Sequence, residues 1–86
     1  MSLRMEIHTP AHSSILRMAY AKAQELLVCN SLEHFTLALS QELGSTKNKN
    51  GTRVEAFVRV YAPKNERKVH LMYFQKNKIL ATITEA

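Results

Sequence analysis

The chain has 86 residues, with twelve Lys and Arg, seven Glu, no Asp and one cysteine, and its formal net charge at pH 7 is +5. This length predicts one small domain covering residues 1–86. A single cysteine excludes an internal disulfide, and the four histidines do not combine with it at zinc-ligand spacing, so we expect no metal. Because the only glycines are Gly44 and Gly51, a glycine-rich phosphate loop is excluded, and we expect no nucleotide or other cofactor.

No apolar run approaches the roughly 18 residues that a membrane span needs, and no charged-then-apolar leader opens the chain. We therefore expect a cytoplasmic protein without a membrane partner, and the lone thiol suits a reducing compartment. Met5 is a candidate natural start, in which case residues 1–4 are an added extension.

The positive charge is concentrated in the second half of the chain. Residues 1–44 carry three Lys or Arg against four Glu, whereas residues 45–86 carry nine against three. A basic patch attracts polyanions, because phosphate neutralisation releases counterions. The alternative interpretation is that the charge serves solubility alone.

The first half predicts a short strand at residues 5–8 and an amphipathic helix at 14–29. The helix follows from apolar residues that recur at helical spacing: Leu16, Ala19, Tyr20, Ala23, Leu26 and Leu27. Residues 31–43 fit two patterns. As a helix, Ser31 would be the cap and Gly44 the stop; as a strand, Phe35, Leu37 and Leu39 would point inward. We favour the strand, because residues 34–40 alternate between apolar and polar side chains.

The second half predicts strands at 53–62, 68–75 and 78–84, after a polar loop that ends in Asn50-Gly51. Residues 78–84 are alternatively the beginning of a helix that the chain end cuts short. The fold class is therefore α+β: a short N-terminal strand and one amphipathic helix packed on a three- to four-stranded antiparallel sheet. Whether the chain is a truncated form of a longer fold stays open.

The strands at 53–62 and 68–75 have two unlike faces. One face is aliphatic, and a single helix suffices to cover it. The other face interleaves basic with aromatic residues, which can neutralise phosphate and stack on bases. The candidate RNA-binding residues on that face are Arg53, Phe57, Arg59, Tyr61, Lys68, His70 and Phe74. The lysines and arginines of the adjoining loops, at positions 47, 49, 64, 67, 76 and 78, would extend a basic rim.

Two alternatives use the same region. A homodimer or other protein-interaction domain would cover Phe57, Met72 and Phe74 with a second subunit. A ribonuclease would need an acid, a base and a phosphate stabiliser, and the available side chains are Glu55, Arg59, His70, Tyr73 and Lys76. No nucleophile motif accompanies that set, so we favour a binding module over an enzyme and assign no catalytic residue.

The order of elements resembles that of the ribosome hibernation-promoting factors, also called ribosome-associated protein Y, which run β-α-β-β-β-α. Met-Glu-Ile-His at 5–8 is similar to the first strand of that family, and residues 14–29 to its first helix. Leu32 to Leu39 are similar to its second strand, and residues 53–62 and 68–75 to the next two. The resemblance implies a ribosome-associated protein that binds the small ribosomal subunit through basic residues.

A second resemblance is to the RelE/ParE-type toxins, which are small, basic and end in antiparallel strands. The run Val-His-Leu-Met-Tyr-Phe-Gln-Lys-Asn-Lys at 69–78 is similar to their closing strand and basic tail. Those toxins have a second helix, which this chain has only if residues 31–43 are helical. The leading hypothesis is a non-catalytic module that binds RNA or the ribosome.

Overall fold

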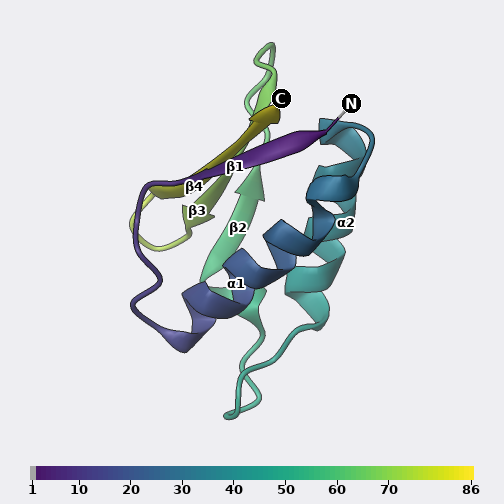
Figure 1. Cartoon of the computed structure of the whole chain (residues 1–86). Helices are drawn as coiled ribbons and strands as arrows, with labels where there is room; N and C mark the ends of the chain where they lie inside the picture. Colours follow the sequence, from purple (N-terminus) through teal and green to yellow (C-terminus); the bar gives the residue numbers. More distant parts are fainter. Residues whose placement is uncertain (1) are drawn as a thin grey trace.

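The structure, a computed structural model, describes residues 2–86 and is α+β, as the sequence predicts. In that range β1 (Leu3–Ile7), α1 (Ser14–Glu25) and α2 (Leu32–Ser45) precede β2 (Val58–Tyr61), β3 (Lys68–Tyr73) and β4 (Lys78–Glu85). The strands form one antiparallel sheet in the order β1-β4-β3-β2, so the first strand lies beside the last (Figure 1). Two 3₁₀ turns, η1 (Leu26–Val28) and η2 (Val54–Ala56), complete the fold.

α1 begins where Ser13 caps it, since the Ser13 hydroxyl accepts a hydrogen bond from the amide of Leu16 at 3.3 Å. The predicted stripe is buried at its centre, where Leu16, Ala19, Tyr20 and Ala23 face the sheet. The helix was expected to continue to Cys29, but the chain tightens into η1 after Glu25. Leu26 and Leu27 are consequently only partly buried.

Residues 32–45 form a helix, so the favoured strand at 31–43 and the expectation of a single helix are both wrong. Ser31 caps α2, because its hydroxyl accepts from the amide of His34 at 3.1 Å. The buried residues of α2 are Phe35, Leu39 and Leu43, which follow one another at four-residue spacing. That spacing buries a continuous apolar stripe, whereas a strand would have turned the exposed Leu37 inward.

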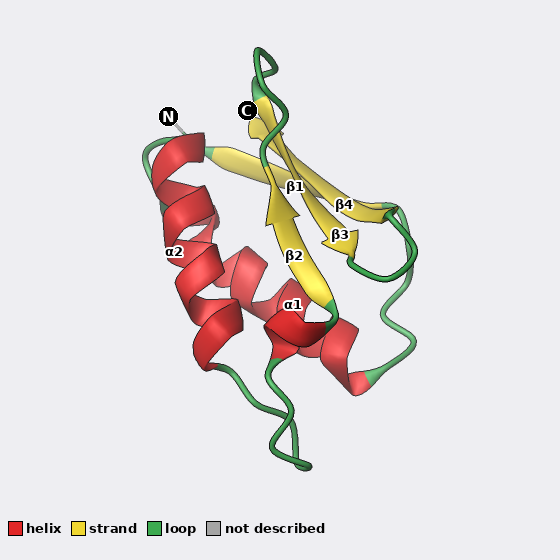
Figure 2. Ribbon diagram, turned by 180° about the vertical axis from the view of Figure 1, so that it is seen from behind, coloured by secondary structure: helices red, strands yellow, loops and turns green. Residues whose placement is uncertain are grey.

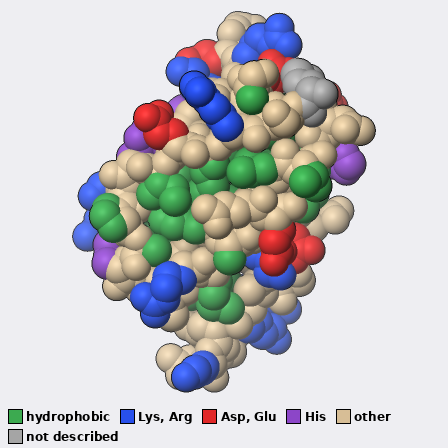
Figure 3. Space-filling view, viewed as in Figure 1, with side chains coloured by type: hydrophobic (Ala, Val, Ile, Leu, Met, Phe, Trp, Pro, Cys, Tyr) green, Lys and Arg blue, Asp and Glu red, His purple; other side chains and the backbone are tan. Residues whose placement is uncertain are grey.

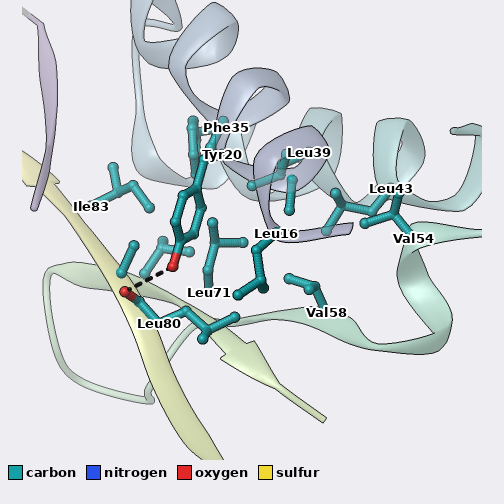
Figure 4. Packing of buried hydrophobic residues seen from close by; sticks show 14 of the residues in the cluster. Leu16, Tyr20, Phe35, Leu39, Leu43, Val54, Val58, Leu71, Leu80 and Ile83 are labelled. Carbon is teal, nitrogen blue, oxygen red and sulfur yellow. Dashed lines mark hydrogen bonds between the residues drawn. The ribbon is translucent and has the colours of Figure 1, made fainter. Parts of the chain in front are cut away.

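Both helices pack on the same side of the sheet (Figure 2). The sheet residues under them are fully buried and form the core with the helix stripes; they are Val58, Val69, Leu71, Leu80, Ala81 and Ile83. Figure 4 labels Val58, Leu71, Leu80 and Ile83 among the helix residues on which they pack. Leu3 belongs to this core as well, at 6% exposed, and pairs with Glu85 in the sheet.

The strand predicted at 53–62 is shorter than expected. Val54 to Ala56 form η2, which the hydrogen bond from the Val54 amide to the Thr46 carbonyl ties to the end of α2 at 2.9 Å. Regular pairing begins at Val58, opposite Tyr73, and ends at Tyr61, opposite His70. β2 is therefore an edge strand of four residues.

β4 contains an irregularity that the sequence pattern does not predict. Leu71 pairs with Ala81 but Met72 pairs with Ile79, so Leu80 is an extra residue, as in a β-bulge. The bulge turns Leu80 into the core next to Ala81 and leaves Ile79 exposed. The Leu80 carbonyl accepts from the amides of His8 and Thr9 at 2.8 and 3.1 Å and from the Tyr20 hydroxyl at 3.4 Å, the bond dashed in Figure 4.

In the part of the chain that the structure describes, no helix is long and apolar enough to cross a membrane.

We predict that Leu39→Ala lowers the free energy of unfolding by about 2–5 kcal/mol, because Leu39 is 0% exposed and its removal leaves a cavity. Leu37→Ala is the matched control on the same helix, since Leu37 is 63% exposed; it should change stability by about 0.5 kcal/mol or less. Urea unfolding of both variants measures the difference. A large loss in Leu37→Ala would contradict the helical assignment of these residues.

Candidate nucleic-acid interface

The side of the sheet away from the helices is here called the outer face. Strand alternation and the register place on it side chains from all four strands: Arg4 and Glu6 of β1, Arg59 and Tyr61 of β2, Lys68, His70 and Met72 of β3, and Ile79, Thr82 and Thr84 of β4. Phe74 follows β3 on the same side, where it meets Arg59. Within residues 2–86, no helix covers this face.

Two of its aromatic rings are exposed and each is paired with a nitrogen-rich side chain. The Arg59 guanidinium lies 4.3 Å from the centroid of the Phe74 ring, a cation–π distance. The rings of Tyr61 and His70 are stacked, with centroids 6.4 Å apart and planes 18° apart. Because Tyr61 is 53% and Phe74 46% exposed, both rings keep area for a further planar group.

The positive charge of the outer face is partly compensated. Lys68 forms an ion pair of 3.4 Å with Glu66. The 2.8 Å ion pair of Arg67 with Glu85 lies toward the helix side of the sheet, because Glu85 is opposite the buried Leu3 in the register. Among residues 2–86, the side-chain hydrogen bond of Arg59 runs from its Nε to the Glu55 carbonyl at 3.2 Å, beside the cation–π contact with Phe74. With no ion pair among the described residues, the guanidinium groups of Arg59 and Arg4 are placed to meet a phosphate on this face.

Two of the seven candidate residues precede β2, although Phe57 lies beside Phe74, whose amide donates to the Phe57 carbonyl at 2.8 Å. Arg53 precedes η2 and makes an isolated bridge to Lys47 in the polar loop, so it is outside β2. Phe57 adopts φ −121° and ψ −31° just before β2 and packs partly against the core. The structure brings Arg59, Tyr61, Lys68, His70 and Phe74 together on the outer face.

The expected basic rim is divided between the two ends of the molecule, whose longest dimension is 37 Å. Lys47 and Lys49 lie in the loop after α2, where they border a hollow of about 500 Å³ with Ser14 and Met18 of α1. The hairpin between β2 and β3, which carries Lys64 and Arg67, projects at the opposite end (Figure 1). Figure 3 shows basic side chains at both ends and hydrophobic ones between them, over β1 and α1.

The five side chains considered for catalysis do not form one group. Glu55 and Arg59 border the same small hollow, of about 100 Å³, between α2 and β2. Tyr73 packs against the core, with the Lys76 ammonium 6.0 Å from its ring. His70 is bound instead to Thr82 of β4. This arrangement does not place an acid, a base and a phosphate stabiliser around one point.

Two residues outside the candidate RNA-binding set join His70 on the outer face. Thr82 Oγ1 lies 3.0 Å from His70 Nδ1 and 2.9 Å from His8 Nε2. The alternation of side chains along β4 indicates which face of the sheet Thr82 occupies. The position of His8 depends on the pairing of β1 with β4, which sequence periodicity does not reveal. Among residues 2–86, no three His, Cys, Asp or Glu side chains come together as metal ligands would.

Burial lowers the pKa of His70 below its usual value of 6.5, and the charge of Lys68 lowers it further. His8 acts in the same direction, while Glu66 opposes it. At neutral pH the His70 imidazole is therefore uncharged, and its protonation requires a more acidic solution than that of a free histidine.

Comparisons of the chain with protein families, with curated proteins and with solved structures found no match. Residues 32–39, which the resemblance to the hibernation-promoting factors matched to a strand, are helical. The second helix that the resemblance to RelE/ParE-type toxins requires is present as α2.

We predict that stability falls as the pH drops below about 6.5, partly because of His70. The folded state holds a proton on His70 less readily than the unfolded chain, so acid favours unfolding. Urea midpoints in phosphate-free buffer at about pH 7.5 and about pH 5 measure the loss, which should be smaller in His70→Gln. His34→Gln, on the exposed side of α2, is the control and should not reduce the loss as His70→Gln does. An equal loss in His70→Gln and the unaltered protein would refute this role.

Proposed function

We propose that the protein binds RNA, free or within the ribosome, through the outer face of its sheet. The observation that carries the proposal is the pairing of two exposed aromatic rings with nitrogen-rich side chains, Phe74 with Arg59 and Tyr61 with His70. A sheet surface of this kind offers rings for base stacking and cations for phosphates at neighbouring positions.

The proposed contacts have different energetic roles. Stacking of a base on an exposed ring contributes about 1–3 kcal/mol, with little dependence on sequence. Phosphate contacts contribute through counterion release and therefore weaken with salt. Because Lys68 is already paired with Glu66, the main phosphate contact proposed is Arg59, and Lys68 contributes to the extent that its ion pair opens.

We predict that RNA binding, measured by filter binding across a salt series, weakens as salt rises. Arg59→Gln should reduce the slope of log affinity against log salt by about one phosphate contact, and Lys68→Gln by no more than that. Arg17→Gln is the matched control, because it removes the same charge from the exposed side of α1. An equal effect of Arg17→Gln would mean that net charge alone drives binding, and absence of binding at low salt would refute the proposal.

A homodimer is the alternative that the same face allows, since Phe74 and Ile79 are exposed beside Met72. Light scattering at high concentration, combined with the RNA-binding assay, distinguishes the two functions. A monomer that binds RNA supports the proposal. If the protein dimerises and dimerisation abolishes RNA binding, the outer face is the dimer interface.

A ribonuclease related to the RelE/ParE-type toxins is the second candidate, and the observation that favours it is the helix at Leu32–Ser45. We predict that such an enzyme would cleave single-stranded or messenger RNA in a gel assay, and that His70→Ala would abolish the cleavage. Intact RNA after prolonged incubation with the folded protein would remove this candidate. Cleavage that persists unchanged in His70→Ala would point to a contaminating nuclease or to other residues.

A further inference from the structure

Three side chains from three different strand segments meet on the outer face. His8 follows β1, His70 lies in β3, and Thr82 of β4 is between them because β4 separates those two strands in the sheet. The Thr82 hydroxyl oxygen is 2.9 Å from His8 Nε2 and 3.0 Å from His70 Nδ1. One hydroxyl therefore joins two imidazoles.

The hydrogen-bonding capacity of a hydroxyl limits what this cluster can do. A threonine hydroxyl has one hydrogen and two acceptor lone pairs. When both rings are neutral, Thr82 can donate to one ring and accept from the other. When both rings are protonated, each donates to Thr82, which then has no acceptor left for its own hydrogen among the two rings. In that state the Thr82 hydrogen is free to turn toward a ligand.

Protonation also places two positive charges close together. His8 and Lys68 both disfavour the charged form of His70, and burial disfavours it most. The other charged or titratable groups of the surroundings are Arg4 and Glu6 from β1, Tyr61 from β2, Glu66 beside Lys68, and the closed pair of Arg67 with Glu85. An anion held by both rings would relieve the repulsion between them.

A hollow adjoins the cluster at Thr82, which is the member of the cluster that lines it. This hollow of about 300 Å³ lies along β1 and β4, lined by Arg4, Met5, Glu6, Thr82 and Thr84. Arg4 is held there by a hydrogen bond from its Nε to Thr84 Oγ1 at 3.4 Å, which leaves the rest of its guanidinium for a ligand. Glu6 lies opposite Thr82 in the register and works against an anion.

We propose that His8, His70 and the Thr82 hydroxyl form a binding site for a phosphate oxyanion, completed by Arg4 and opposed by Glu6. The anion binds when both imidazoles are protonated and Thr82 donates outward. This site would extend the proposed RNA contact to the part of the outer face formed by β1 and β4. The proposal depends on the proposed function only in attributing the bound phosphate to RNA.

The first test is an NMR titration with inorganic phosphate at about pH 5.5 and about pH 7.5, following the ring protons of all four histidines. The expected result is a saturable shift of His8 and His70 at the lower pH, little shift of either at the higher pH, and no saturable shift of His34. Absence of a saturable shift at the lower pH, or equal shifts of His34, would overturn the proposal.

The second test uses variants. Thr82→Val removes the hydroxyl and should weaken phosphate binding about tenfold, the effect of losing a hydrogen bond to a charged group. Thr36→Val, the same change on α2, is the control and should have no effect. Glu6→Gln should strengthen binding, and it remains informative if Thr82→Val fails to fold. Unchanged affinity in Glu6→Gln and in a folded Thr82→Val would overturn the assignment.

A third arm separates this site from the proposed function. This arm uses RNA without terminal phosphates. If that RNA binds more tightly at about pH 5.5 than at about pH 7.5, and if Thr82→Val abolishes the difference, the site binds phosphodiesters. Phosphate binding without any RNA binding keeps the site, as one for phosphomonoesters or free phosphate, and refutes the proposed function. RNA binding that is unaffected by pH and by Thr82→Val keeps the proposed function and refutes this site.

Discussion

The backbone carbonyl of Leu80 is the point on which the arrangement of this molecule depends. It accepts hydrogen bonds from the amides of His8 and Thr9 and lies within reach of the Tyr20 hydroxyl, so it joins the end of β1, the turn into α1 and α1 itself to β4. Tyr20 also donates to the Thr9 carbonyl at 2.6 Å. Buried polar groups that were left unpaired here would be costly, so these bonds hold the first helix in one position.

The bulge at Leu80 links that anchor to the outer face. By adding one residue to β4, it directs Leu80 into the core while Thr82, two positions later, remains on the outer face between β1 and β3. The same carbonyl holds the His8 amide, and this fixes the backbone from which the His8 side chain reaches Thr82. The core and the histidine cluster are therefore positioned by one irregularity in one strand.

Alternation predicted β3 and β4 and their inward residues well, because Val69, Leu71, Ala81 and Ile83 follow a period of two. It failed at residues 32–45, where the run from His34 to Ser40 also alternates. The deciding signals were local: the Ser31 cap, Glu33 in the first turn, and the four-residue spacing of Phe35, Leu39 and Leu43. The run Ile-Leu-Ala at 79–81 does not predict a bulge, because all three side chains are apolar and the pattern does not show which of them face the core.

The candidate site was predictable to the extent that it lies within one hairpin. Arg59, Tyr61, His70 and Phe74 are brought together by the pairing of β2 with β3, which are adjacent in the chain. The contact between His8 and Thr82 could not be predicted from the sequence, because these residues are 74 positions apart and meet through the pairing of the first strand with the last. Arg53 lies outside β2 for another reason. η2 (Val54–Ala56) separates Arg53 from the first residue of β2, so the strand alternation does not extend back to it.

The shortness of β2 has a consequence for how this protein can associate with other chains. An exposed sheet edge is a template on which another strand can add, and long flat edges promote aggregation. β2 has four residues, lies between η2 and the buried Pro63, and so presents very few unpaired backbone groups. Growth of the sheet by strand addition is disfavoured at this edge. A macromolecule that binds this part of the sheet is therefore recognised through side chains of the outer face rather than through the backbone of β2.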